Sequence, residues 1–430
     1  MKSDYADSSR PTNVRYLLVV ATCLVAFFMY IDRACVSQMK KDIQTDLSVS
    51  DAEMDWVFSA FFWSYALAQV PSGFLGKRFG LRHSLAVMLF TWSLCTAVCG
   101  LVTGLYSLLV ARLAVGLAEA GAYPTAAALV KGWFPVRERG RGSGLVALGG
   151  RLGWALSQHL TPRLAAVAYG WRGVLVIFGL VGMVWSFVFW FIARDRPREH
   201  PWSNAAEDER TGPPDPPPAA DEWPLADLAT SRNMWLFGLV QFGVNVGWAF
   251  LITKLPAMLQ ERYGATDDQK GDIAALPAWA SCVGMFLGGF IGDAMVRRYG
   301  LRWGRRLPIA TMLFVAGLAY LLCPTLDTPW SVAVALAVMA VSVDIGVPSI
   351  WAFAQDVGGR HVGAALGWGN MFGNLGAAVS PLALGAIQRA YGWDAMFLTC
   401  AGCFAVAGVA ALNLDATRPV LRPAPEARGP

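Results

Sequence analysis

Apolar runs of about 20 residues recur along the whole chain and are separated by short polar segments. A helix of this length crosses a hydrocarbon core of about 30 Å, because each residue advances it by about 1.5 Å. The pattern predicts twelve transmembrane helices, over residues 15–38, 52–75, 83–102, 105–130, 142–168, 172–193, 232–260, 272–296, 307–323, 330–355, 362–387 and 393–414. The first run is too long for a signal peptide and has no small-residue cleavage site, so we expect it to stay in the membrane.

Composition supports the same class of protein. Of the 430 residues, 55% are hydrophobic and only 15% are charged. Soluble domains rarely combine these two values. The sequence therefore predicts an all-α integral membrane protein.

A change of composition divides the chain. Residues 194–231 are rich in proline and in charges of both signs, which is typical of a linker. Six predicted helices precede this linker in residues 1–193, and six follow it in residues 232–430. The sequence SGFLGKRFGLR at 72–82 resembles GGFIGDAMVRRYGLR at 288–302, at matching places in the two halves. We therefore expect two pseudo-symmetric six-helix bundles that arose by duplication.

Basic residues show which way the chain crosses the membrane. They gather in the loops after even-numbered helices, whereas the opposite loops are sparse or acidic. Because Lys and Arg concentrate in cytoplasmic loops, we expect a multi-pass protein of the cell (inner) membrane with both termini in the cytoplasm. The net charge of +5 then reflects loop placement, and no nucleic-acid partner is expected. The loop residues are Lys77, Arg78, Arg82, Lys131, Arg137, Arg139, Arg141, Arg297, Arg298, Arg302, Arg305 and Arg306.

Four ionisable residues interrupt two otherwise apolar runs: Asp32, Arg33, Arg112 and Glu119. Each such charge costs on the order of 2.5–3.5 kcal/mol at the bilayer centre by insertion scales, so it normally faces a protein interior or an aqueous path. A symporter of anions needs a fixed cation and a buried acid that can load and release a proton. These four residues supply both. The alternative is a purely structural ion-pair network between the spans 15–38 and 105–130.

Several motifs narrow this interpretation to a family. They are Y-I-D-R at 30–33, R-x6-E within ARLAVGLAEAGAYP, the downstream WFPVRERGRG, and DRPREHPW at 195–202. Together they resemble the anion:cation symporter family of the major facilitator superfamily, which includes bacterial proton-coupled transporters of galactonate, glucarate and hexuronates. The resemblance implies that Asp32 and Glu119 carry protons, that Arg33 and Arg112 couple them to the anion, and that Tyr30 contacts the substrate.

The repeated segments resemble the loop motif of the same superfamily, which helps to close the cytoplasmic gate. The matching residues are Gly73, Arg78, Gly80, Asp293 and Arg297. The first copy departs from the pattern, with Lys77 where an acid is usual. This departure puts the usual gate of the first half in doubt, and a tight positive loop remains an alternative role for the motif.

Other polar residues of the spans are candidates for substrate binding. The segment 367–381 resembles the family's eleventh helix, which implies sugar-hydroxyl contacts for Asn370 or Asn374, with helix packing as the alternative. Gln241 and Asn245 share a face with Trp248 by their spacing, and can line a path or join helices. Lys254 replaces a usual aromatic residue, and the alternative to a substrate contact is that its side chain reaches toward the membrane surface.

Arg151 and Asp344 are charges that depart from the commoner family pattern, and both fall at predicted mid-membrane depth. A further cation at this depth suits a second substrate carboxylate, which favours dicarboxylic sugar acids. The alternative is an ion pair between Arg151 and Asp344, or between Arg151 and Glu119.

The sequence thus predicts a secondary active transporter that imports an organic anion, a sugar acid such as an aldarate, aldonate or hexuronate, by proton symport through alternating access. We expect no enzyme activity, no cofactor besides the coupling protons, no metal and no ATP, and a monomer in the lipid bilayer. An organophosphate/phosphate-type exchanger using Arg33 and Lys254 is the main rival. A transporter-like membrane sensor is another, although the chain carries no appended signalling domain.

Overall fold

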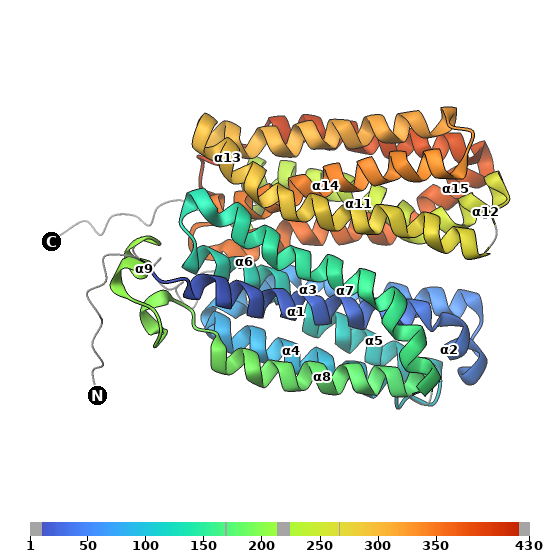
Figure 1. Cartoon of the computed structure of the whole chain (residues 1–430), viewed down its shortest axis with the longest axis horizontal. Coiled ribbons are helices and arrows are strands. Elements are labelled where there is room, and N and C mark those ends of the chain that lie inside the picture. The colour runs from blue at the N-terminus through green and yellow to red at the C-terminus, as the bar shows by residue number, and fades with distance from the viewer. Residues whose placement is uncertain (1–10, 168–169, 213–223, 266, 421–430) are drawn as a thin grey trace.

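The computed structural model describes residues 11–167, 170–212, 224–265 and 267–420, and every regular element among them is a helix (Figure 1). The first half contains α1 (Val14–Gln38), α2 (Lys40–Leu47), α3 (Asp51–Arg78), α4 (Leu81–Cys99), α5 (Leu105–Glu119), α6 (Ala122–Trp133), η1 (Val136–Glu138), α7 (Arg139–Val167) and α8 (Gly170–Ile192). The linker contains η2 (Pro197–Glu199), α9 (Ala205–Glu209) and α10 (Leu225–Thr230). The second half contains α11 (Arg232–Thr253), α12 (Leu255–Tyr263), α13 (Asp267–Leu322), η3 (Cys323–Thr325), α14 (Pro329–Val357), η4 (Gly359–His361) and α15 (Val362–Leu412).

Two of these helices are each two membrane passes joined by a sharp turn. Within α13, Gly300 has φ 74°, and within α15, Gly392 has φ 82°. Both values lie in the left-handed region, which glycine adopts at no steric cost. When α13 and α15 are divided at these residues and α5 and α6 are taken as one pass, the described residues form twelve passes. The predicted all-α fold of twelve transmembrane helices is confirmed.

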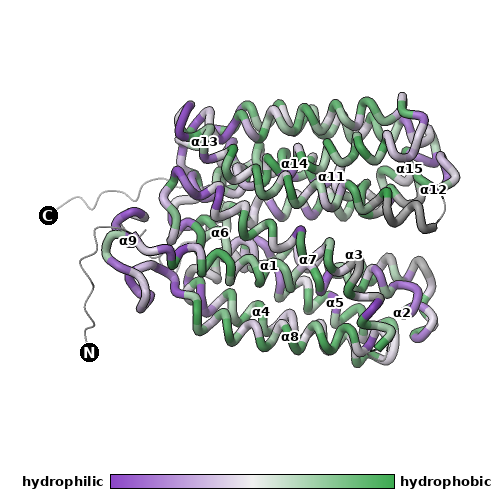
Figure 2. The backbone as a smooth tube through the Cα atoms, in the orientation of Figure 1, coloured by the Kyte–Doolittle hydropathy of each residue, from purple (hydrophilic) through white to green (hydrophobic). Residues whose placement is uncertain are grey.

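The distribution of hydrophobic residues along the passes fits a bilayer. Eight helical segments of the described chain are long and apolar enough to cross a membrane. Figure 2 shows hydrophobic residues along the length of the helices and hydrophilic residues gathered toward the two ends of the molecule. The protein is therefore a multi-pass membrane protein.

The passes form two groups, which we call the N-half (α1–α8) and the C-half (α11–α15) (Figure 1). Within the N-half, α1 packs on α7 and α4 on α8; within the C-half, α13 packs on α14 and α11 on α15. The described parts nearest to both termini and helix α9 lie together at one end, which we call the linker end. Helices α2 and α12 lie at the opposite end, which we call the α2 end.

The first part of the linker is docked on the N-half, which the sequence did not indicate. Glu207 of α9 pairs with Arg15 of α1 at 3.0 Å, and Arg210 pairs with Glu138 of η1 at 2.7 Å. Burial raises the pKa of Glu207, and the neighbouring Arg15 opposes that rise. Asp195 accepts hydrogen bonds from the first backbone N–H groups of α4, at 2.7 and 3.0 Å. These contacts make residues 194–212 part of the N-half.

Candidate functional site

A buried ion pair joins α1 to α5 in the interior of the N-half. The Nε of Arg33 donates to Oε2 of Glu119 at 2.6 Å, and the Glu119 side chain is fully buried. Glu119 Oε1 and Arg33 Nη2 are buried without a hydrogen-bond partner. The pair therefore keeps one unused acceptor and one unused donor, which a further polar group could satisfy. Glu119, which is predicted to carry a proton, and Arg33, which is predicted to couple it to the anion, are thus in direct contact.

Asp32 faces a different neighbour from Arg33, although the two are adjacent in the sequence. Its Oδ2 accepts a hydrogen bond from Thr96 of α4 at 3.5 Å, and its Oδ1 has no partner. Arg112 and Glu119 lie within electrostatic range of the Asp32 carboxyl. Asp32 and Arg112 are themselves buried, at 1% and 3% exposed. The structure therefore gathers all four predicted ionisable residues of the N-half into one cluster.

Aromatic rings enclose the cationic part of this cluster. The guanidinium carbon of Arg33 lies 4.3 Å from the ring centre of Tyr65, 5.0 Å from Phe61 and 5.3 Å from Tyr30. That of Arg112 lies 4.6 Å from Phe61. Such contacts stabilise a desolvated cation. Tyr30 was among the residues predicted from the sequence, whereas Phe61 and Tyr65 were not. Their spacing of four residues in an apolar run was the available signal.

A second ion pair connects the N-half to the C-half. Arg151 of α7 donates from Nη2 to Oδ1 of Asp344 on α14 at 2.8 Å, and Ser281 of α13 donates to the other carboxyl oxygen. The guanidinium carbon of Arg151 lies 4.2 Å from the ring centre of Trp248 on α11. Of the alternatives open from the sequence, the structure shows Arg151 paired with Asp344. Ser281 was not anticipated, since a single serine in an apolar helix is a weak signal.

Four amide side chains form a polar patch between α11 and α15. Gln241 donates to Oδ1 of Asn370 at 3.0 Å. Asn245 donates to the backbone oxygen of Gln241 at 2.9 Å, and Asn374 to that of Asn370 at 2.8 Å. Asn245, Asn370 and Asn374 are half-buried, so part of each of these residues is exposed. The four candidates from two helices thus form one group.

Lys254 lies apart from these groups. It follows α11 directly and lies beside Gly385 of α15, so that a Cβ on Gly385 would stand 3.3 Å from its Nζ. Six residues of helix, about 9 Å, separate it from Trp248. A substrate contact for Lys254 stays a prediction.

The linker end is closed by contacts between the halves. Asp293 accepts hydrogen bonds from the backbone N–H groups of Gly140 and Arg141 at 2.9 and 3.0 Å, at the start of α7. An acid at a helix N-terminus is electrostatically favourable. Asp356 of α14 pairs with Arg139 at 2.7 Å and with Arg305 at 2.9 Å. Asp293 therefore joins the two halves at the linker end, and its gating role stays a prediction.

Other residues of the repeated motif have different surroundings. Arg78 and Arg297 are exposed, and Gly80 adopts φ 89° before the start of α4. Gly73 packs directly on Gly363 of α15. The side chain of Lys77 lies outside the described residues.

Contacts between α7 and α14 form a column that leads from the linker end to the Arg151 pair. They join Arg139 to Asp356 at 2.7 Å, Ser143 to Gln355 at 3.1 Å and Arg151 to Asp344 at 2.8 Å. On each helix these residues extend over an interval of twelve positions, 139–151 and 344–356, so the column is about 18 Å long. The Arg151 pair is the last of these polar contacts before the middle of the molecule.

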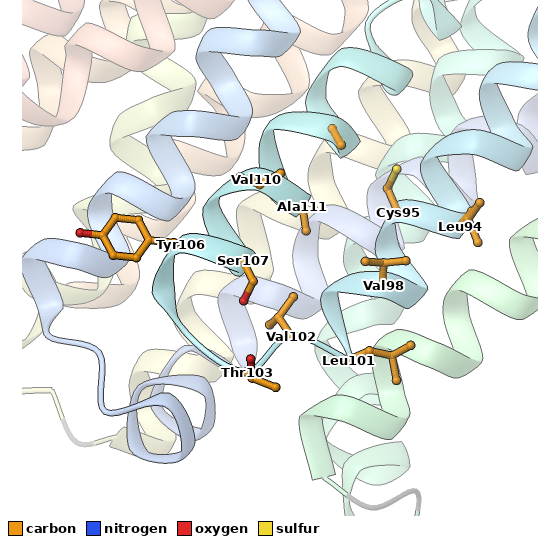
Figure 3. Close-up of a pocket in the computed structure, with 11 residues that line it drawn as sticks. Leu94, Cys95, Val98, Leu101, Val102, Thr103, Tyr106, Ser107, Val110 and Ala111 are labelled. Carbon is orange, nitrogen blue, oxygen red and sulfur yellow. The ribbon is translucent and has the colours of Figure 1, made fainter.

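A separate apolar depression lies on the outer surface, between α4 and α5 (Figure 3). It is lined by Leu94, Cys95, Val98, Leu101, Val102, Thr103, Tyr106, Ser107, Val110, Ala111 and Ala114. Tyr106 and Val110 are exposed on this face, whereas Arg112 and Glu119 are buried on the other face of α5. The depression contains no charged side chain, so it suits lipid contact and not an anion.

The chain is similar to known proteins both in sequence and in fold. The sequence profile of the Major Facilitator Superfamily matches residues 22–264 and 237–430. The probable sulfoacetate transporter SauU of Cupriavidus necator is 30% identical over 413 residues, covering 93% of this chain and 94% of its own. The probable galactarate/D-glucarate transporter GudP of Pseudomonas putida is 32% identical over 403 residues, covering 89% and 87%. The Escherichia coli fucose:proton symporter FucP has the same fold, with a TM-score of 0.72 at 15% identity over 93% of this chain and 98% of its own.

Proposed function

The chain belongs to the Major Facilitator Superfamily, and on this premise we propose that it imports an organic anion together with protons by alternating access. The substrate is a sugar acid or a related small carboxylate. The observation that carries the proposal is the buried contact between Arg33 and Glu119, with Asp32 and Arg112 in the same cluster. A fixed cation attracts the anion, and the neighbouring acids can take up and release the accompanying protons.

The relatives support this substrate class. The protein from Cupriavidus necator is named as a probable sulfoacetate transporter, and that from Pseudomonas putida as a probable galactarate/D-glucarate transporter. Each of these substrates is a small anion with two acidic groups. The amide patch of Gln241, Asn245, Asn370 and Asn374 suits the hydroxyl groups of a sugar acid, because amides both donate and accept hydrogen bonds.

Coupling follows from the Arg33 contact. When the substrate carboxylate approaches, it competes with Glu119 for the guanidinium group, and Arg can bind a carboxylate with two parallel hydrogen bonds. A displaced Glu119 loses its counter-ion and gains affinity for a proton, because burial disfavours its charged form. Anion and proton therefore load together. We assign the proton roles to Asp32 and Glu119 and the coupling roles to Arg33 and Arg112.

The closed linker end represents one state of the transport cycle. We propose that this end faces the cytoplasm of the cell, since the basic loops gather there. Import then requires the contacts of Asp293 and Asp356 to break, so that the two halves separate at the linker end. The opposite closure, at the α2 end, completes alternating access.

Uptake into proteoliposomes tests the proposal. Labelled D-glucarate, sulfoacetate and D-galactonate are offered under an inward proton gradient, with a protonophore as the control. Accumulation that the protonophore abolishes is expected for at least one of the three. Accumulation of organophosphate against internal phosphate, without a proton requirement, would instead establish an exchanger. Specific binding of these anions without flux would indicate a sensor.

A further inference from the structure

The contact between Arg151 and Asp344 bridges the two halves of the protein. Arg151 lies on α7 of the N-half, whereas Asp344 on α14 and its partner Ser281 on α13 belong to the C-half. Both carboxyl oxygens of Asp344 are engaged, and its side chain is fully buried. Any separation of the halves at this level must therefore give Arg151 another partner or leave it unpaired. Leaving a largely desolvated Arg without an ionic partner is unfavourable.

The Arg151 side chain retains capacity for a ligand. Its Nε is buried without a hydrogen-bond partner, and one face of its guanidinium group lies over Trp248. Tyr30 lies within electrostatic range of Arg151 and under the guanidinium group of Arg33. Arg33 also has a buried nitrogen, Nη2, without a partner. Two arginines with unmet donors therefore flank the same tyrosine.

We propose that Asp344 is a built-in carboxylate that holds Arg151 until the second acidic group of a dianionic substrate replaces it. This inference rests on the proposed function and narrows it. Dianions, whether dicarboxylates or carboxylate-sulfonates, are bound at Arg33 through one acidic group and at Arg151 through the other. A monoanion is bound at Arg33 and gains no ionic contact when the contact between the halves breaks.

The exchange is energetically plausible because one acidic group replaces another on the same cation. Arg151 stays paired throughout, and the displaced Asp344 keeps its hydrogen bond from Ser281. A ligand shifts a conformational equilibrium only through different affinities for the two states. A dianion gains an ionic contact that requires the contact between the halves to break, so it favours their separation. The Arg151 pair is the innermost contact of the column between α7 and α14, which suits this role.

A double-mutant cycle on the purified full-length protein tests the inference. Isothermal titration calorimetry measures the Kd of D-glucarate and sulfoacetate as dianions and of D-galactonate as a monoanion. The variants are Asp344→Asn, Arg151→Gln and the double substitution, and Asp356→Asn is the matched control. Asp356 also pairs across the two halves but lies at the linker end of the column.

Removal of the competing carboxylate in Asp344→Asn should tighten both dianions about ten-fold and leave galactonate nearly unchanged. Arg151→Gln should abolish the preference for dianions. The double variant should bind the three anions with the same affinities as Arg151→Gln. It contains no unpaired buried charge, so it is expected to fold more readily than either single variant. Asp356→Asn should leave the ratio of dianion to monoanion affinity as in the wild type.

Three results would overturn the inference. One is an unchanged or weakened dianion affinity in Asp344→Asn. Another is an equal increase in the affinity for all three anions in Asp344→Asn. The third is a higher dianion affinity in the double variant than in Arg151→Gln. Failure of the proposed function is distinguishable, because the wild type itself would then accumulate none of the three anions in proteoliposomes, whatever their affinities.

Discussion

Gly73→Ala should shift the protein away from the state in which the linker end is closed. A Cβ on Gly73 of α3 would stand 2.3 Å from the backbone oxygen of Gly363 on α15, and a Cβ on Gly363 would stand 2.4 Å from that of Gly73. Ordinary van der Waals contact starts at 3.4 Å, so the shortfall is 1.1 Å. Both partners are helix backbones, so a side-chain rotation cannot relieve the clash.

The free-energy cost of this clash in the closed state can be estimated. Overpacking of a close contact typically costs about 1–3 kcal/mol. Because α3 and α15 belong to different halves, this cost applies only where the halves meet at the linker end, and each half keeps its own packing. A bias of that size changes the ratio of the closed to the open state by about 5- to 150-fold.

Hydrogen–deuterium exchange with mass spectrometry measures this shift on the intact protein. Exchange at the start of α7 and around η4 should rise in Gly73→Ala, since these segments meet the opposite half. Two controls separate the causes. Gly179→Ala places a Cβ 2.5 Å from the backbone oxygen of Ser93 within the N-half, and Gly402→Ala meets nothing within 4 Å.

Gly179→Ala should lower the melting temperature without selective exchange at the linker end, and Gly402→Ala should do neither. The reasoning would be refuted if Gly73→Ala showed the exchange pattern of the wild type. A general loss of protection throughout the N-half, as expected for Gly179→Ala, would also refute it.

Three further substitutions have defined outcomes. Glu119→Gln should abolish proton-driven accumulation in proteoliposomes but permit substrate exchange, because an amide cannot release a proton; accumulation at the wild-type rate would contradict a proton role. Asn370→Ala should raise the KM for glucarate and galactonate by about ten-fold, as expected for the loss of one or two hydrogen bonds. Sulfoacetate has no hydroxyl groups, so its uptake should be unchanged. Equal losses for all three substrates would indicate a structural role. Glu207→Ala leaves Arg15 without its partner and should speed amide exchange of residues 197–209 about ten-fold, whereas exposed Glu209→Ala should not.

The membrane passes were predictable because the length of an apolar run translates directly into a helix that crosses the bilayer. The predicted span 232–260 began at the residue where α11 begins. The structure divides this span at Lys254, after which α12 begins with a new turn. Such a break depends on local backbone geometry, which hydropathy does not report.

The ionisable cluster was also visible in the sequence, because charges are conspicuous in an apolar run. The sequence did not show which residues of the cluster pair with each other. Asp32 and Arg33 are neighbours in the sequence, but successive helix side chains point about 100° apart, so they face α4 and α5 respectively. Arg305 was counted among the basic loop residues, yet it is 1% exposed and paired with Asp356. Partners on other helices become known only when the helices are packed.

The docking of α9 through Arg15 and Glu138 leaves a short covalent tether between the halves. Because residues 194–212 are held against the N-half, they are expected to move with it as one body. A fluorescent reporter attached at exposed Glu209 of α9 would therefore follow the N-half, and its distance from a second reporter on the C-half would measure the separation of the halves.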